Sequence, residues 1–102
     1  MKKDYSHIEK MENIMVSQEN TIKKLQEVLD NLDRGIKDYK ALNKYYYSEK
    51  REEDLKDEEN HLIPEEMHRG VLSEDEVYNL FLDTHDAALH MIETALKLLK
   101  TD

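Results

Sequence analysis

The stretch HLIPEEMHRGVLSEDEVYNLF, residues His61–Phe81, decides how this chain turns. It contains the only Pro of the sequence, Pro64, and one of the two Gly, Gly70. Pro is favoured in the first turn of a helix, and Gly is favoured in the left-handed conformation that ends one. The pattern therefore predicts a short helix that begins at Pro64 and ends at a left-handed Gly70.

The same stretch contains the best helix-start signal of the chain. Ser73 and Glu76 have the spacing of a capping box, in which the Ser hydroxyl accepts from the Glu76 N–H and the Glu carboxylate reaches back to the Ser73 N–H. Leu72 and Val77 occupy the positions of a hydrophobic staple. We therefore predict a structural corner, followed by a C-terminal helix near residues 74–100. The corner comprises Pro64, Gly70, Leu72, Ser73, Glu76 and Val77.

The composition predicts one all-α domain over residues 1–102. Two Gly and one Pro leave few turns, which argues against a sheet built from hairpins. The net charge of −9 excludes nucleic acid and an anionic membrane surface as expected partners, since both would repel the chain. No Cys is present, so neither disulfides nor thiolate metal ligands are available. The N-terminal MKKDYSHIEK lacks the apolar core of a signal peptide, and we expect a cytoplasmic protein.

A heptad pattern predicts a long first helix near residues 6–47, with Ser6 and Glu9 as its capping box. Gly35 could end this helix and give a three-helix up-down arrangement instead. The heptad keeps its phase across Gly35, which favours one long helix. The pattern positions are Ile8, Met11, Met15, Gln18, Ile22, Leu25, Leu29, Leu32, Ile36, Tyr39, Asn43 and Tyr46.

The two long helices should pack antiparallel in an elongated bundle, with short helices between them. Between them lies Ser48–Asn60, which carries seven acids and three bases and reads as a solvated connector or a short helix. The C-terminal helix has two neighbouring apolar stripes, one beginning at Val77 and the other at Tyr78. Its apolar surface is wider than a single partner helix covers, which predicts self-association.

The sequence offers little for catalysis or metal binding. His61, Glu65 and His68 could share one face of a helix, but Pro64 interrupts that geometry. Ser73 is explained by capping, and neither a thiol nor a Gly-rich phosphate loop is present. We therefore expect no enzyme and no cofactor.

The motif Gly70-Val71-Leu72-Ser73-Glu74-Asp75, with Tyr78 after it, resembles the small bacterial proteins grouped as domain of unknown function 4298. The resemblance implies a long N-terminal helix ending in a Tyr pair, an acidic connector, a turn and a terminal helix. Family members often carry a Trp shortly after the Tyr pair, where this chain has Lys50 and Arg51, so the connector should pack less firmly. The resemblance also implies a candidate interaction surface made of Tyr46, Tyr47, Asp54, Arg69, Asp75 and Tyr78.

Two functions remain open at this point. The first is a non-enzymatic helical interaction module that binds a second copy, as a dimer, or another protein. The alternative is a small protein that binds a ligand or a divalent metal through the acidic connector and the 61–69 corner.

Overall fold

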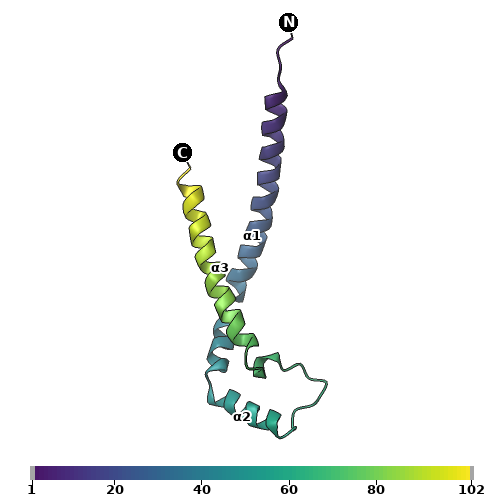
Figure 1. The fold of residues 1–102 in the computed structure, drawn as a ribbon, viewed down its shortest axis with the longest axis vertical. Coiled ribbons are helices and arrows are strands. Elements are labelled where there is room, and N and C mark those ends of the chain that lie inside the picture. Colours follow the sequence, from purple (N-terminus) through teal and green to yellow (C-terminus); the bar gives the residue numbers. More distant parts are fainter. Residues whose placement is uncertain (1, 102) are drawn as a thin grey trace. The chain divides into compact units, whose positions relative to one another are not determined.

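The computed structural model of the chain describes residues 2–101. Four elements follow one another: helix α1 (Ser6–Tyr46), helix α2 (Glu49–Glu59), the 3-10 turn η1 (Gly70–Leu72) and helix α3 (Glu76–Leu99), shown in Figure 1. No strand occurs between residues 2 and 101. The predicted all-α fold, with a long helix at each end and short helical segments between them, is confirmed.

The chain divides into two units, of which the first ends at Ala41 and the second begins at Leu42. The first unit is therefore made almost entirely of α1. The second contains the last turn of α1 together with α2, η1 and α3.

The helix α1 begins at Ser6, but Ser6 does not cap it. The backbone N–H of Ser6 donates to Oδ1 of Asp4 over 2.9 Å. Asp4 therefore supplies the capping oxygen, and the predicted box of Ser6 and Glu9 is wrong. Because the carboxylate accepts this backbone N–H, the pKa of Asp4 is lowered from its ordinary value.

Gly35 lies inside α1, which continues without a break for 41 residues. The prediction of a single long helix is confirmed. A Cβ placed on Gly35 would meet no atom within 4 Å, so no neighbouring group explains a Gly at this position. The helix continues through Gly35 at the cost of about 1 kcal/mol that an interior Gly carries relative to Ala.

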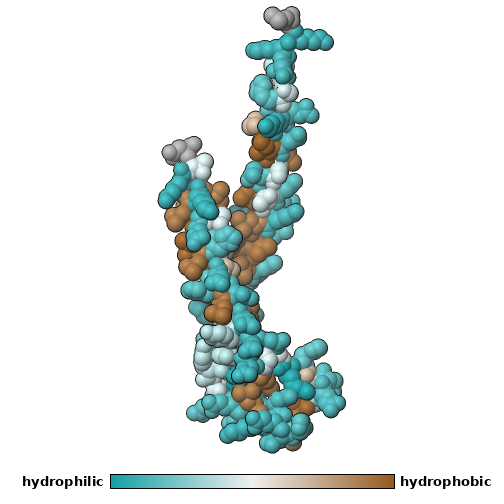
Figure 2. Space-filling view, in the orientation of Figure 1, coloured by the Kyte–Doolittle hydropathy of each residue, from teal (hydrophilic) through white to brown (hydrophobic). Residues whose placement is uncertain are grey.

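None of the residues of α1 is buried. Its hydrophobic heptad side chains between Ile8 and Ile36 are mostly exposed, and Figure 2 shows hydrophobic side chains on both long helices. The apolar stripe that predicted the helix therefore lies uncovered along most of the first unit.

In the second unit, the acidic connector forms the helix α2. Ser48 caps its start, since its Oγ accepts from the N–H of Arg51 over 3.2 Å. His61 follows its last turn in a left-handed conformation, with a φ of 58°. The N–H of His61 donates to the carbonyl of Glu58 over 3.1 Å, and that of Leu62 to the carbonyl of Asp57 over 2.9 Å. These two bonds are those of a Schellman motif, with His61 in the position that usually holds Gly.

The predicted short helix from Pro64 to a left-handed Gly70 is wrong. Pro64 opens a turn, in which its carbonyl accepts from the N–H of Met67 over 3.1 Å. No described Gly has a positive φ, and Gly70 instead begins η1. The side-chain carboxylate of Glu76 lies where a Cβ on Gly70 would stand. A close approach, and not a left-handed backbone, is what the missing side chain at Gly70 allows.

Half of the predicted capping box of α3 is present. The Oγ of Ser73 accepts from the N–H of Glu76 over 3.0 Å. The N–H of Ser73 donates to the carbonyl of Gly70 over 3.0 Å and not, as the capping box requires, to the carboxylate of Glu76. The helix α3 begins at Glu76, two residues later than predicted.

The core of the second unit is small. Val77, with 5% of its surface exposed, is the one buried residue among residues 2–101. Half-buried apolar and aromatic side chains accompany it in this unit. They are Leu42, Tyr45, Tyr46, Leu55, Ile63, Leu72 and Phe81.

Candidate functional site

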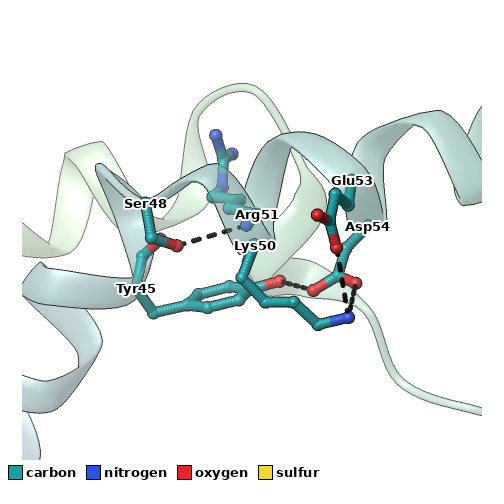
Figure 3. A network of polar contacts seen from close by, with 6 residues as sticks. All are labelled: Tyr45, Ser48, Lys50, Arg51, Glu53 and Asp54. Carbon is teal, nitrogen blue, oxygen red and sulfur yellow. Dashed lines mark hydrogen bonds and ion pairs between the residues drawn. The ribbon is translucent and has the colours of Figure 1, made fainter.

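The richest set of side-chain contacts lies where the last turn of α1 meets α2. The hydroxyl of Tyr45 donates to Oδ2 of Asp54 over 2.6 Å (Figure 3). The Nζ of Lys50 lies 3.4 Å from Oδ1 of the same carboxylate and 3.6 Å from Oε2 of Glu53. This group of Tyr45, Lys50, Glu53 and Asp54 joins the end of α1 to the first two turns of α2.

The charges of this group shift the pKa of its members. Burial and the hydrogen bond to Asp54 raise the pKa of Tyr45 to about 12. The hydrogen bond that Tyr45 donates lowers the pKa of Asp54. The nearby carboxylates, Asp54 foremost, raise the pKa of Lys50. Each shift favours the protonation state that keeps the contacts intact at neutral pH.

Among the residues at the junction of α1 and α2, Arg51 contacts the largest number of elements. Its guanidinium carbon lies 4.4 Å from the ring centroid of Tyr46, in a cation–π contact. Its Nε donates to the carbonyl of Val71 over 3.1 Å, and its Nη2 to the carbonyl of Ser73 over 3.2 Å. One side chain on α2 therefore binds α1, η1 and the approach to α3.

The contacts of Arg51 attach the connector helix α2 to its neighbours. The absence of the family's Trp predicted looser packing of α2, yet Arg51 lies on the Tyr46 ring in that part of the sequence. Sequence reasoning missed this residue because two of its partners are backbone carbonyls, which carry no signature in the sequence. The position of the missing Trp was the one signal that could have pointed to it.

Aromatic contacts continue the corner into α3. The rings of Tyr46 and Phe81 meet edge to face, with their centroids 5.5 Å apart. The ring of Tyr47 meets Tyr46 in the same manner at 4.9 Å, although 71% of Tyr47 is exposed. Tyr46 therefore lies between Phe81 on one side and the Arg51 guanidinium on another.

A separate ion pair secures the segment between α2 and η1. The Nε of Arg69 lies 2.9 Å from Oε2 of Glu58, and its Nη1 donates to the carbonyl of Pro64 over 2.8 Å. The Glu58 oxygen is shielded from solvent and receives no aligned hydrogen bond, so the guanidinium charge is what compensates it.

The residues of the predicted interaction surface have different surroundings. Tyr46 and Arg69 are half-buried in structural contacts, and Asp54 is bound by Tyr45, the neighbour of Tyr46. Asp75 is the residue before α3 and makes no capping bond with its side chain. Tyr47 and Tyr78 are the aromatic members with exposed rings. Asp54 and Arg69 thus make structural contacts, whereas Tyr47 and Tyr78 are exposed.

No group of three or more His, Asp or Glu side chains among residues 2–101 is placed to hold a metal ion. His61, Glu65 and His68 do not form the metal-binding trio that their spacing suggested. His61 instead ends α2 through its backbone conformation.

The apolar surface that the corner leaves uncovered lies on α3. The side chains of one of its two predicted stripes are about half exposed or more from Tyr78 to the C-terminal end of the helix. Their exposed fractions include 49% for Tyr78, 48% for Leu89, 58% for Ile92, 49% for Leu96 and 80% for Leu99. No helix among the described residues is long and apolar enough to cross a membrane.

Comparison with known proteins gives one match. The profile of the family described as Domain of unknown function (DUF4298) matches residues 8–94. No curated protein and no solved structure matches the chain. The matched region contains the heptad helix, the acidic connector and the Gly-Val-Leu-Ser turn on which the resemblance was based. The chain therefore belongs to the family of domain of unknown function 4298.

Proposed function

We propose that the protein is a non-enzymatic helical interaction module that self-associates through the apolar faces of α1 and α3. The observation that supports this is the exposed apolar stripe of α3, described above. Soluble monomers rarely expose a contiguous apolar patch larger than a few hundred Å². A second copy that covers the stripe removes it from water.

The width of the apolar surface on α3 favours an intermolecular partner. Its two stripes are adjacent, so together they cover a broad arc of the helix. A single neighbouring helix buries one stripe, and a second apolar surface is needed for the other. A closed pair of copies supplies that surface with the commonest symmetry of soluble oligomers.

The net charge of the chain favours a protein partner over nucleic acid or an anionic membrane. A chain with a charge of −9 repels nucleic acid and anionic lipid, whereas apolar association tolerates charges that lie outside the contact. In this proposal the contacts of Arg51 with Tyr46 and with the carbonyl of Ser73 act as a scaffold, because they hold the start of α3 in place.

The test is the oligomeric state in solution. Sedimentation of the parent protein at tens of micromolar should give a dimer. The double variant Leu96→Lys with Leu99→Lys should be a folded monomer that melts at a lower temperature. Asp86→Lys is the matched control, since it adds the same two units of charge on the opposite face of α3 and should remain a dimer. A monomeric parent would refute the proposal.

A further inference from the structure

The helix α3 is too short to cover the N-terminal half of α1, whatever the angle between the two helices. Phe81 of α3 packs against Tyr46 of α1. Beyond Phe81, α3 has 18 more residues, 82–99. The same number of residues counted back from Tyr46 along α1 ends at Val28. Because both helices rise by ~1.5 Å per residue, α3 does not reach the residues before Val28.

This uncovered segment carries a regular apolar seam. In heptad notation, its a positions are Ile8, Met15 and Ile22, and its d positions are Met11, Gln18 and Leu25. The five apolar members are between 42% and 55% exposed. Two of its three a positions are Ile and one of its three d positions is Leu, and Ile at a with Leu at d favours parallel two-stranded coiled coils.

The surface of this segment contains a shallow, largely open depression. It is lined by Met15, Gln18, Glu19 and Ile22, with Lys23 beside them. The first four follow the spacing i, i+3, i+4 and i+7. Four residues at this spacing form the hole that receives one side chain, the knob, from the partner helix in a coiled coil.

We propose that residues 8–25 of α1 pair with the same residues of a second copy, in parallel and in register. This inference rests on the proposed self-association and specifies which residues of α1 take part in it and in which orientation. The knob that enters the hole around Gln18 is then Gln18 of the second copy.

Gln18 decides the orientation of the pair. In a parallel pair in register, each d residue faces the same residue of the partner, so the two Gln18 amides can hydrogen-bond to one another. In an antiparallel pair, a d residue faces an a residue. The a positions of this segment are all apolar, which would leave the Gln18 amide against Ile or Met without a partner.

The flanking charges favour the same orientation. In the parallel pair, position g faces position e of the partner, which places His7 opposite Glu12, and Ile14 opposite Glu19. In the antiparallel pair that overlaps residues 8–25, the e positions face each other, and Glu12 lies opposite Glu19 at both ends. The antiparallel form therefore brings like charges together and the parallel form does not.

One antiparallel register would satisfy Gln18 by placing it opposite Asn43, another a position. That register also places Tyr46 opposite Met15. The ring of Tyr46 is already packed against Phe81 and under the Arg51 guanidinium, so this register conflicts with the corner.

Disulfide cross-linking tests the pairing, because the chain contains no Cys. Full-length Met11→Cys should form a covalent dimer under oxidised glutathione, since d residues of a parallel pair have the Cα separation that a disulfide needs. Asn13→Cys, at an exposed position on the opposite face of the same turns, is the matched control. We expect Met11→Cys to cross-link at least about tenfold faster than this control. In an equal mixture of Met11→Cys and Ile22→Cys, the 11–11 disulfide should exceed the 11–22 disulfide, as read by mass spectrometry.

Two results would overturn the pairing. An excess of the 11–22 disulfide would show antiparallel helices, and equal rates for Met11→Cys and Asn13→Cys would show that residues 8–25 do not pair. Sedimentation of the parent separates these from failure of the proposed function. A parent dimer with unreactive Met11→Cys overturns the seam alone, whereas a monomeric parent overturns self-association itself.

Discussion

The hydroxyl of Tyr45 donates a hydrogen bond of 2.6 Å to the carboxylate of Asp54, nine residues later in the chain. This bond crosses the junction between α1 and α2, so it holds the angle at which the connector leaves the first helix. Tyr45→Phe should lower the free energy of unfolding by about 1 kcal/mol, as the loss of one hydrogen bond does. Tyr47→Phe is the control, because the ring of Tyr47 is largely exposed.

Because of the same bond, the free energy of unfolding should depend on pH in the alkaline range. The folded state raises the pKa of Tyr45 from 10.0 to about 12, so it binds the phenolic proton more tightly than the unfolded state. The stabilisation is complete below pH 10 and is lost as the pH rises through 12. Spectroscopic titration of tyrosinate should show a phase with its midpoint near pH 12 that is absent in Tyr45→Phe. An unchanged titration in Tyr45→Phe would contradict the assignment.

His61→Gly should stabilise the protein. His61 has a φ of 58°, a conformation that costs a residue with a Cβ roughly 1 kcal/mol and costs Gly almost nothing. Thermal denaturation should therefore show a higher melting temperature. Asn60→Gly is the matched control, since Asn60 has a φ of −87° and gains nothing from Gly. A His61→Gly variant that melts below the parent would show that the imidazole makes a contact that outweighs the strain.

Arg51→Lys should destabilise the corner although it keeps the charge. A lysine ammonium cannot reproduce the planar contact with Tyr46 together with bonds to the carbonyls of Val71 and Ser73. We expect a loss of about 1–2 kcal/mol in chemical denaturation, the cost of unmaking hydrogen bonds from a charged group. Lys50→Arg, at the preceding exposed position, should leave stability unchanged. Equal effects of the two substitutions would argue against a special role for Arg51.

Gly35→Ala should raise the stability of α1 by roughly 1 kcal/mol, the difference in helix propensity between the two residues. A Cβ at Gly35 meets no atom within 4 Å, so no clash offsets this gain. The melting temperature followed by circular dichroism measures the effect. Ala41→Gly, at an exposed position of the same helix, should lower it by a similar amount. A destabilised Gly35→Ala variant would reveal a close contact with a partner at that position.

Helix positions could be predicted from this sequence because they depend on patterns that repeat. The heptad from Ile8 to Tyr46 maintained its phase across Gly35, and the helix is indeed continuous. The start of α3 was also predicted to within two residues, since Ser73 carries its capping signal in its own side chain. Signals of this kind are local, so they survive without knowledge of the tertiary structure.

The details of the corner could not be predicted, because they depend on tertiary contacts. Gly at a left-handed helix end is a strong statistical rule, yet here His61 adopts that conformation and Gly70 accommodates the Glu76 carboxylate. The partners of Arg51 are carbonyls of Val71 and Ser73, twenty residues or more along the chain. Only the folded chain brings these groups within hydrogen-bonding distance.

The absence of any buried residue in α1 has a consequence for local unfolding. Few isolated helices are stable in water, and an amide in an uncovered helix exchanges its hydrogen whenever the helix frays. The amides of residues 8–25 should therefore exchange quickly in dilute protein and slowly in concentrated protein, if a second copy covers them. Those near the buried Val77 should exchange at a rate that dilution changes far less, because their protection comes from within the chain. Hydrogen exchange at two protein concentrations would thus distinguish, for each amide, protection that arises within one chain from protection that arises from association with a second copy.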